Sequence, residues 1–257
     1  EMCIRDRIMA GFNLAYNNPP KLKGTIMQNS VIIHHNSSSM TSQHTVIWLH
    51  GLGANGDDFV PIVPELGLDL PVKFIFPNAD LLPITINGGY VMPAWYDILA
   101  MDDITREVDL VQIGRSARRI MAIIDSEIAR GVPIQNIVLA GFSQGGAIAY
   151  EVALQLLKQN KKLGGLLALS TYFATYANYC PQDFADSTLP TAIHHGSFDV
   201  IVAPQLGKQA FDALTALNFT PNFRLYPMAH QVCPEQIIAI GQWLTCLLNN
   251  RDENKQS

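Results

Sequence analysis

The chain has 257 residues, of which 48 % are hydrophobic and 15 % are charged, and its formal net charge is -5. This composition is typical of a folded globular protein and excludes a disordered segment. Phosphate binding needs a concentrated basic face, which a mild acidic excess does not provide, so we expect no nucleic-acid partner.

The four cysteines do not have the spacing of a metal or redox site. Cys3, Cys180, Cys233 and Cys246 form no C-x-x-C pair. We therefore expect free thiols in a reducing compartment, with no metal and a cytoplasmic location. No apolar run reaches the roughly 20 residues that span a bilayer. We also expect no secretory signal, because no charged start is followed by an apolar stretch and a cleavage site.

The chain divides into three predicted regions: an N-terminal extension over residues 1–40, one domain over residues 41–250 and a polar tail over residues 251–257. The segment Met2-Cys-Ile-Arg-Asp-Arg7 resembles the translation of a sequencing adaptor, so part of the extension is expected to be artefactual. Met9 and Met27 are both candidate starts. The extension is polar, and we expect little packed structure before about residue 30.

Short apolar runs alternate with longer amphipathic stretches from Thr45 onward. In chain order the pattern predicts a strand at 45–50, a strand at 72–76, a loop to about 94, a helix at 105–130, a strand at 137–140, a helix at 147–158, strands at 165–169 and 191–195, a helix at 203–217, a strand at 222–226 and a helix at 236–248. Strands that alternate with helices indicate an α/β fold, with a mostly parallel sheet covered by helices on both faces.

The candidate catalytic and binding residues lie in four segments that directly follow predicted strands. They are residues 50–53, 141–145, 195–199 and 226–230. Ligands of open parallel sheets bind beyond the carboxyl ends of the strands, so these segments are expected to meet at one edge of the sheet.

Gly141-Phe-Ser143-Gln-Gly145 fits the pattern G-x-S-x-G. It follows a predicted strand and precedes a predicted helix, which is the context that a strained nucleophile turn requires. Glycines on both sides of the serine leave room for the crowded backbone. The pattern predicts Ser143 as a nucleophile, and a capping serine in an ordinary strand-to-helix turn is the alternative.

A serine nucleophile needs a base, and the base needs an anionic orienter. In hydrolases with such a turn, the acid and then the histidine follow the serine along the chain. His194 and His195 end a strand, whereas His230 lies in a loop before the last helix. Asp199 follows the strand that ends in His195, so we predict Asp199 as orienter and His230 as base. A base must be neutral, so activity is expected to fall in acid.

Acyl transfer also needs N–H donors for the developing oxyanion. The backbone N–H groups of Gln144, next to the nucleophile, and of Leu52, in the loop after the first predicted strand, are the predicted donors. That loop also matches G-x-G-x-x-G over residues 51–56, the fingerprint of a dinucleotide-binding oxidoreductase. Asp57 and Asp58 would lie where the pyrophosphate sits, which disfavours that alternative. We expect them to cap the next turn.

Taken in order, seven segments resemble the acyl-protein thioesterase and carboxylesterase family of α/β hydrolases. They are Trp48-Leu-His-Gly-Leu-Gly-Ala54, Phe59-Val-Pro-Ile-Val-Pro-Glu65, Phe76-Pro-Asn-Ala79, Thr85-Ile-Asn-Gly-Gly-Tyr-Val-Met-Pro-Ala-Trp-Tyr-Asp97, Gly141-Phe-Ser-Gln-Gly-Gly-Ala147, His195-Gly-Ser-Phe-Asp199 and Tyr226-Pro-Met-Ala-His230. The resemblance implies an α/β-hydrolase fold and a triad of Ser143, Asp199 and His230. It also implies oxyanion donors at Leu52 and Gln144 and no metal or organic cofactor. No insertion is long enough for a large lid domain.

The resemblance implies hydrolysis of short- to medium-chain carboxylic esters, lysophospholipids or acyl-protein thioesters, so acylated proteins are candidate partners. A homodimer is left open. Met92 and Trp95 in one loop and Tyr172 in another are expected to form the walls of the acyl pocket, and aromatic packing beneath long loops is the alternative. A non-catalytic ligand-binding protein on the same scaffold is the alternative function.

Overall fold

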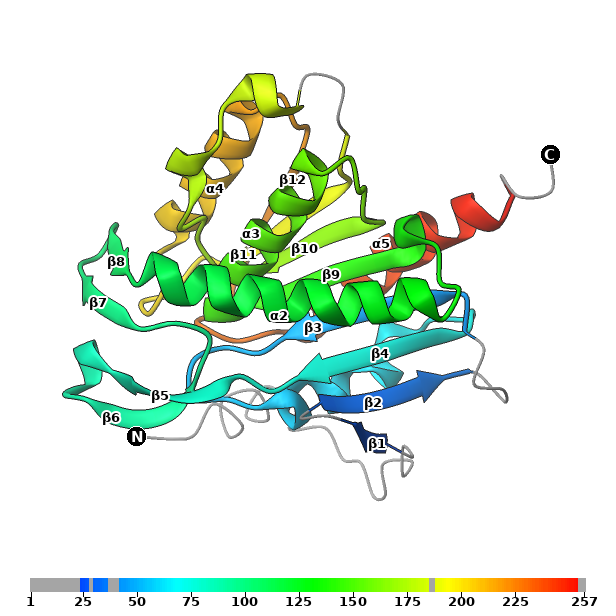
Figure 1. Cartoon of the computed structure of the whole chain (residues 1–257), viewed down its shortest axis with the longest axis horizontal. Helices are drawn as coiled ribbons and strands as arrows, with labels where there is room; N and C mark the ends of the chain where they lie inside the picture. Colours follow the sequence, from blue (N-terminus) through cyan, green and yellow to red (C-terminus); the bar gives the residue numbers. More distant parts are fainter. Residues whose placement is uncertain (1–23, 28–29, 37–41, 185–187, 254–257) are drawn as a thin grey trace.

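A central eight-stranded sheet organises the molecule, in a computed structural model that describes residues 24–27, 30–36, 42–184 and 188–253. Across the sheet the strands are β1 (Gly24–Met27), β2 (Ser30–His35), β4 (Val72–Pro77), β3 (His44–Leu49), β9 (Ile137–Phe142), β10 (Gly165–Leu169), β11 (Thr191–Gly196) and β12 (Asn222–Tyr226) (Figure 1). β2 runs antiparallel to β1 and β4, and the strands from β4 to β12 are parallel to their neighbours. The prediction of a mostly parallel sheet is confirmed.

The remaining elements are helices and two short hairpins. The α-helices are α2 (Leu110–Ala129), α3 (Gln144–Lys158), α4 (Pro204–Ala216) and α5 (Pro234–Glu253). The hairpins pair β5 (Asp80–Ile84) with β6 (Tyr90–Ala94) and β7 (Ile98–Met101) with β8 (Arg106–Val108). Short 3-10 helices are η1 (Gly56–Ile62), η2 (Pro64–Leu66), η3 (Thr85–Asn87), η4 (Ile134–Asn136), η5 (Tyr176–Asn178) and η6 (Pro181–Phe184).

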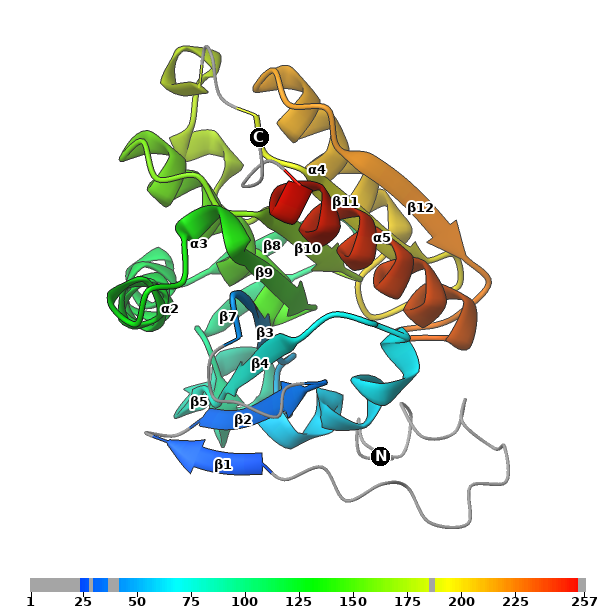
Figure 2. The same ribbon diagram turned by 90° about the vertical axis from the view of Figure 1, so that its right-hand side faces the viewer.

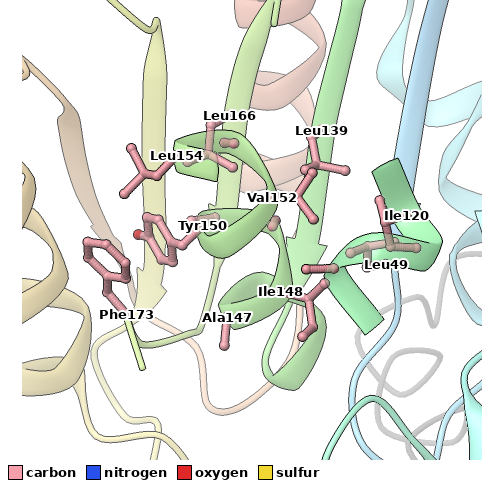
Figure 3. Packing of buried hydrophobic residues seen from close by; sticks show 14 of the residues in the cluster. Leu49, Ile120, Leu139, Ala147, Ile148, Tyr150, Val152, Leu154, Leu166 and Phe173 are labelled. Atoms are coloured by element: carbon pink, nitrogen blue, oxygen red, sulfur yellow. The ribbon is translucent and has the colours of Figure 1, made fainter. Parts of the chain in front are cut away.

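Helices cover both faces of the sheet because successive strand residues point in opposite directions. Ile47 and Leu49 of β3 pack in the cluster of buried residues that α2, α3 and α4 complete. Val46 and Trp48 pack in a second cluster, with η1, η2 and α5 (Figure 2). Figure 3 shows the first cluster, in which α3 lies against β9 and α2. The predicted α/β-hydrolase architecture is confirmed.

Two predicted elements differ between residues 77 and 110. The predicted loop at 77–94 contains the β5–β6 hairpin. The helix predicted from residue 105 begins at Leu110, because Arg106–Val108 pairs with β7 and the side chain of Asp109 accepts the N–H of Gln112 as an N-cap. Between β4 and α2 the described chain thus forms two short hairpins and no separate lid domain.

The predicted N-terminal extension contains a strand of the central sheet. Val31, Ile32 and Ile33 of β2 are buried, and β2 pairs with β4 along its length. β2 therefore belongs to the central sheet, although it precedes residue 41, where the domain was predicted to begin. Met27 ends β1, whereas Met9 lies outside the described residues.

At the other end, α5 continues to Glu253, three residues into the predicted tail at 251–257. The other predicted domain limits stay predictions. Of the helices in the described ranges, none combines the length and the apolar character that crossing a membrane requires.

Candidate active site

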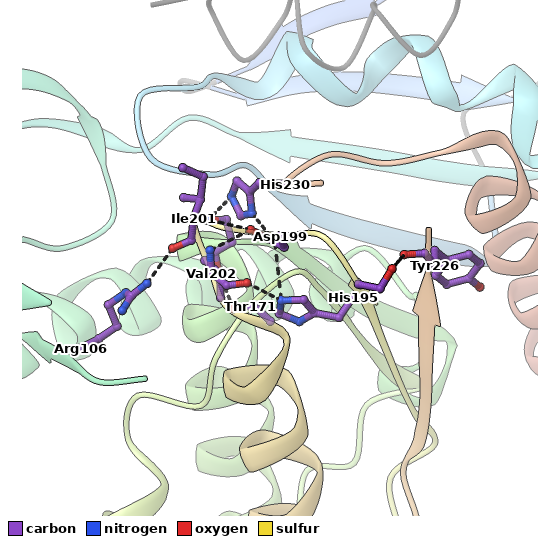
Figure 4. A network of polar contacts seen from close by, with 10 residues as sticks. Arg106, Thr171, His195, Asp199, Ile201, Val202, Tyr226 and His230 are labelled. Atoms are coloured by element: carbon purple, nitrogen blue, oxygen red, sulfur yellow. Dashed lines mark hydrogen bonds and ion pairs between the residues drawn. The ribbon is translucent and has the colours of Figure 1, made fainter. Parts of the chain in front are cut away.

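The three side chains that the sequence predicts as a triad lie together beyond the carboxyl ends of β9, β11 and β12. His230 Nε2 lies 3.0 Å from Ser143 Oγ, and His230 Nδ1 lies 2.7 Å from Asp199 Oδ2. Figure 4 shows the imidazole of His230 facing the carboxylate of Asp199. The three groups form a connected hydrogen-bonded line from a hydroxyl to a carboxylate, which is the arrangement that activates a serine.

The turn between β9 and α3 holds Ser143 in a strained backbone conformation. Its φ is 53° and its ψ is -122°, which side chains rarely adopt. A Cβ on Gly145 would lie 2.5 Å from the carbonyl oxygen of His50, so this position has room only for glycine. The hydroxyl of Thr171 donates to the Ser143 carbonyl at 2.6 Å and ties the turn to the end of β10.

Asp199 is buried and its carboxylate is held in one orientation. Its Oδ1 accepts the backbone N–H groups of Ile201 at 2.9 Å and Val202 at 2.8 Å. Its Oδ2 is thereby directed at His230. Because Asp199 accepts the Nδ1–H of His230, the lone pair of Nε2 faces Ser143.

A second imidazole, that of His195, lies beneath Asp199. His195 is fully buried, and its Nε2–H donates to the Val202 carbonyl at 2.8 Å. The same nitrogen is 3.6 Å from Asp199 Oδ2. His195 Nδ1 has no hydrogen-bond partner among the described residues, and a Cβ on Gly207 of α4 would lie 2.4 Å from it. Burial lowers the pKa of His195, so the ring is neutral and braces the loop that holds Asp199.

The loop after β3 is braced by His50 and Trp95. His50 Nε2 accepts the N–H of Ala79 at 3.0 Å, so its Nδ1 has the proton and donates to the Gly51 carbonyl at 2.7 Å. Burial lowers the pKa of His50 to about 4, which keeps the ring neutral. The indole N–H of Trp95 donates to the His50 carbonyl at 2.8 Å. These bonds fix the loop on which Leu52 lies.

Two backbone N–H groups are available beside the nucleophile. Gln144 is the first residue of α3, where helical N–H groups have no intrahelical acceptor. Its side chain accepts the N–H of Trp95 at 2.8 Å and donates to the carbonyl of Tyr96 at 2.6 Å. In the described chain, the backbone N–H groups of Leu52 and Gln144 donate to no acceptor. The arrangement leaves both N–H groups for a negatively charged oxygen.

The three residues that the sequence predicts around an acyl pocket lie in different surroundings. Trp95 is 1 % exposed and its indole bonds the carbonyl of His50 beneath the Leu52 loop, so its place in a pocket wall stays a prediction. Met92 lies beside Gly53, with its Sδ 3.6 Å from where a Cβ of that glycine would be. Tyr172 lines a cavity of about 770 Å³, and its hydroxyl is 2.7 Å from that of Tyr96.

The glycine loop at 51–56 leads into the 3-10 helix η1 rather than an α-helix. Asn55 is the N-cap of η1: its side chain accepts the N–H of Asp57, and the carboxylate of Asp58 accepts the N–H of Asn55 in a capping box. Of the two carboxylates predicted to cap this turn, only that of Asp58 takes part. Asp57 and Asp58 lie in the first turn of η1, where they would repel a pyrophosphate. Within the described ranges, no group of three or more His, Cys, Asp or Glu side chains is placed to hold a metal ion.

Sequence reasoning missed the supporting roles of His50, Thr171 and His195. Each lies directly at the end of a strand, where candidate chemistry was expected. Position along the chain gave no information about which distant groups these residues would contact. His50 bonds the N–H of Ala79 and the indole N–H of Trp95, and Thr171 bonds the carbonyl of Ser143, across 28 to 45 residues.

Three comparisons relate this chain to known proteins. The family model described as phospholipase/carboxylesterase matches residues 27–248. The chain is 37 % identical to acyl-protein thioesterase 1 of Neurospora crassa over 213 residues, which cover 78 % of this chain and 85 % of that protein. It is 33 % identical to acyl-protein thioesterase 1 homolog 1 of Dictyostelium discoideum, over 86 % of this chain and 96 % of that one. The crystal structure of Zea mays acyl-protein thioesterase 2 superposes with a TM-score of 0.73 at 25 % identity, covering 85 % of this chain and 98 % of that chain.

Proposed function

Because this chain belongs to the phospholipase/carboxylesterase family, we propose that Ser143, His230 and Asp199 are the triad with which it cleaves its substrates. The chain is a serine hydrolase that acts on carboxylic esters or acyl thioesters. The single observation on which the assignment of the triad rests is the 3.0 Å contact between His230 Nε2 and Ser143 Oγ.

In the first half of the reaction, His230 Nε2 takes the proton of Ser143 as Oγ attacks the substrate carbonyl. The backbone N–H groups of Leu52 and Gln144 stabilise the resulting oxyanion. The tetrahedral intermediate then collapses and the C–O or C–S bond breaks. His230 donates its proton to the departing alcohol or thiol, and the acyl group stays on Ser143 as an ester.

In the second half, a water molecule attacks the acyl-enzyme while His230 takes its proton. The carboxylic acid leaves, and the proton on His230 returns to Ser143. Asp199 accepts the Nδ1–H of His230 throughout. It therefore keeps the imidazole in one tautomer and stabilises its positive form in both transition states.

The substrates that we propose are acyl thioesters of proteins and short- or medium-chain esters, with lysophospholipids as a further ester class. Relatives named acyl-protein thioesterase, at 32–37 % identity over most of the chain, support the thioester class. A thiolate is a better leaving group than an alkoxide, so one triad can release both. We further propose a cytoplasmic location, supported by the free thiols of Cys180 and Cys233. The homodimer stays a prediction, which sedimentation of the purified protein would test.

Hydrolysis of p-nitrophenyl butyrate and of an S-butyryl thioester by the purified chain tests this proposal. Ser143→Ala and His230→Ala are each expected to lower kcat by roughly 10³- to 10⁶-fold for both substrates. Asp199→Asn is expected to lower it by roughly 10⁴-fold, because an amide favours the wrong imidazole tautomer. Asp183→Asn, which changes an acid on η6, is the control and should leave kcat unchanged. Wild-type activity in Ser143→Ala would exclude the triad.

A further inference from the structure

The side chain of Gln144 is buried beside the nucleophile, and the proposed mechanism uses only the backbone N–H of this residue. Its carboxamide lies against the backbone of two consecutive residues in another segment. Oε1 accepts the N–H of Trp95 at 2.8 Å, and Nε2 donates to the carbonyl of Tyr96 at 2.6 Å. Gln144 is 1 % exposed, so both bonds lie away from water, where losing a partner costs most.

This pairing fixes the carboxamide in one orientation. Trp95 offers an N–H and Tyr96 offers a carbonyl, so the amide oxygen must face the first and the amide nitrogen the second. Gln144 is also the first residue of α3. The helix that follows the nucleophile is therefore joined at its first residue to the chain around Trp95 by two buried hydrogen bonds.

The chain around Trp95 is itself bonded to the oxyanion loop, on both sides of Leu52. The indole N–H of Trp95 donates to the carbonyl of His50 at 2.8 Å. The carbonyl of Pro93 accepts the N–H of Gly53 at 2.8 Å. Leu52 lies between these two contacts, so the position of its N–H depends on where the backbone around Trp95 lies.

The oxyanion loop also passes close to the nucleophile. A Cβ on Gly51 would lie 3.3 Å from the Cβ of Ser143 and 3.2 Å from the ring of Phe142. A contact of this kind limits how near the loop can come, but it has no direction. The hydrogen bonds through Trp95 are directional, so they determine which way the loop presents its N–H groups.

We propose that the side chain of Gln144 is a positioning group for the oxyanion hole. The backbone N–H of Gln144 is one donor, and its carboxamide sets the position of the other donor, the N–H of Leu52, through Trp95. One residue thus fixes the spacing between the two N–H groups. The oxyanion develops only as the acyl group is attacked, so an error in this spacing weakens binding of the transition state and not of the substrate. This inference rests on the proposed function, because it assumes that Ser143 is the nucleophile.

Gln144→Met tests the inference, because methionine is similarly long and unbranched but forms neither hydrogen bond. We expect kcat for p-nitrophenyl butyrate to fall by roughly ten- to a hundredfold with KM unchanged, since a small misplacement of a catalytic group costs up to about that factor. Butylboronic acid adds to Ser143 as a tetrahedral anion, so its inhibition should weaken by the same factor as kcat/KM. The acidic limb of kcat/KM should stay at the wild-type pH, because His230 keeps its partners.

Gln155→Met is the matched control, because it makes the same substitution in the same helix at a glutamine that bonds Glu151. It should leave kcat, KM and inhibition by butylboronic acid unchanged. Ser116→Ala removes the hydroxyl that donates to the Trp95 carbonyl at 2.5 Å and leaves the residue next to the nucleophile intact. It should show the pattern of Gln144→Met with a smaller loss, which keeps the test decisive if Gln144→Met does not fold.

A double variant tests whether Gln144 acts through Trp95. Trp95→Phe removes the donor to the His50 carbonyl. If both residues hold Leu52 along one path, the fall in kcat of the double variant should be close to the larger of the two single falls. Single losses that multiply would overturn the inference. A Gln144→Met enzyme with the wild-type kcat, or one whose kcat falls without weaker inhibition by butylboronic acid, would overturn it as well.

The wild-type protein separates this inference from the proposal on which it rests. If it hydrolyses p-nitrophenyl butyrate and a fluorophosphonate labels Ser143, the triad stands whatever the Gln144 variants do. If it hydrolyses no ester and is not labelled, the proposed function fails and this inference fails with it.

Discussion

At the scale of single residues, His195 has a supporting position next to the triad. It contacts neither Ser143 nor His230, but it bonds the carbonyl of Val202, whose N–H bonds Asp199. The orientation of Asp199 therefore depends on a neutral imidazole that bonds the neighbouring Val202 carbonyl. Residues that hold a reacting group in this way act on its geometry rather than on substrate binding.

Replacing His195 by leucine should lower kcat by about ten- to a hundredfold and leave KM unchanged, because Asp199 loses its brace. His195→Gln can place an N–H near the former Nε2 and should recover part of kcat. Kinetics with p-nitrophenyl butyrate across pH measure both effects, and His195→Leu should also change the acidic limb of kcat/KM. A leucine variant with the wild-type kcat and acidic limb would show that His195 is a packing residue only.

Trp95 supports the oxyanion loop from below, so its removal should affect all substrates alike. Trp95→Phe leaves the buried His50 carbonyl without its donor, at a cost of about 1–3 kcal/mol. We expect kcat to fall by a similar factor for p-nitrophenyl acetate and for p-nitrophenyl dodecanoate. Tyr90→Phe, on the exposed face of β6, is a control that should change neither. A loss confined to long chains would instead place the indole in the path of the acyl group.

At the scale of elements, the five central strands β3, β4, β9, β10 and β11 could be predicted, whereas the exposed hairpins and the buried strand β2 could not. These five strands are covered on both faces, so each reads as a short apolar run. In β5 and β6, by contrast, Leu81, Tyr90 and Val91 are exposed, and no alternation marks them as strands. The hairpin of β7 and β8 was hidden because its second strand continues the amphipathic pattern of α2.

The β7–β8 hairpin is joined to the loop of the catalytic acid by Arg106. Its guanidinium donates to Ile201 and to two carbonyls of its own hairpin, those of Asp102 and Thr105. Arg106→Ala should therefore loosen both segments together. Hydrogen exchange measured by mass spectrometry should become faster in peptides covering residues 98–108 and 199–202 and stay unchanged in α5. Faster exchange in the hairpin alone would contradict a mechanical link between the two.

At the scale of the whole molecule, the sequence predicts that the candidate catalytic residues lie at one edge of the sheet. It does not predict which strands are neighbours in the sheet. The order β3, β9, β10, β11, β12 brings the turn of Ser143 and the loops of Asp199 and His230 together. Spacing along the chain was enough to select these three residues. The cavity of about 770 Å³ between α4 and the chain after β10 could not be predicted, because its walls come from segments that are far apart along the chain.

Buried neutral histidines should make the stability of the molecule depend on pH. Burial lowers the pKa of His50 and of His194 to about 4 each, while an imidazole in the unfolded chain has a pKa of about 6.5. The unfolded chain thus binds more protons between these values. Above pH 6.5 each histidine contributes about 3 kcal/mol to the free energy of unfolding. This contribution is lost as the pH falls from about 6.5 to about 4.

Urea unfolding between pH 7 and pH 4 should accordingly show the free energy of unfolding falling with pH. His194→Phe removes one of the two groups, so its curve should fall less steeply over the same range. Parallel curves for the wild type and the variant would mean that folding does not lower the pKa of His194.

The central claim is that Ser143 is the nucleophile, and covalent labelling tests it most directly. The purified chain is incubated with a fluorophosphonate and examined by intact mass and peptide mapping. The account predicts one adduct per chain, located on Ser143, with labelling abolished in Ser143→Ala and strongly slowed in His230→Ala. An unlabelled wild-type protein, or an adduct on another residue, would contradict it.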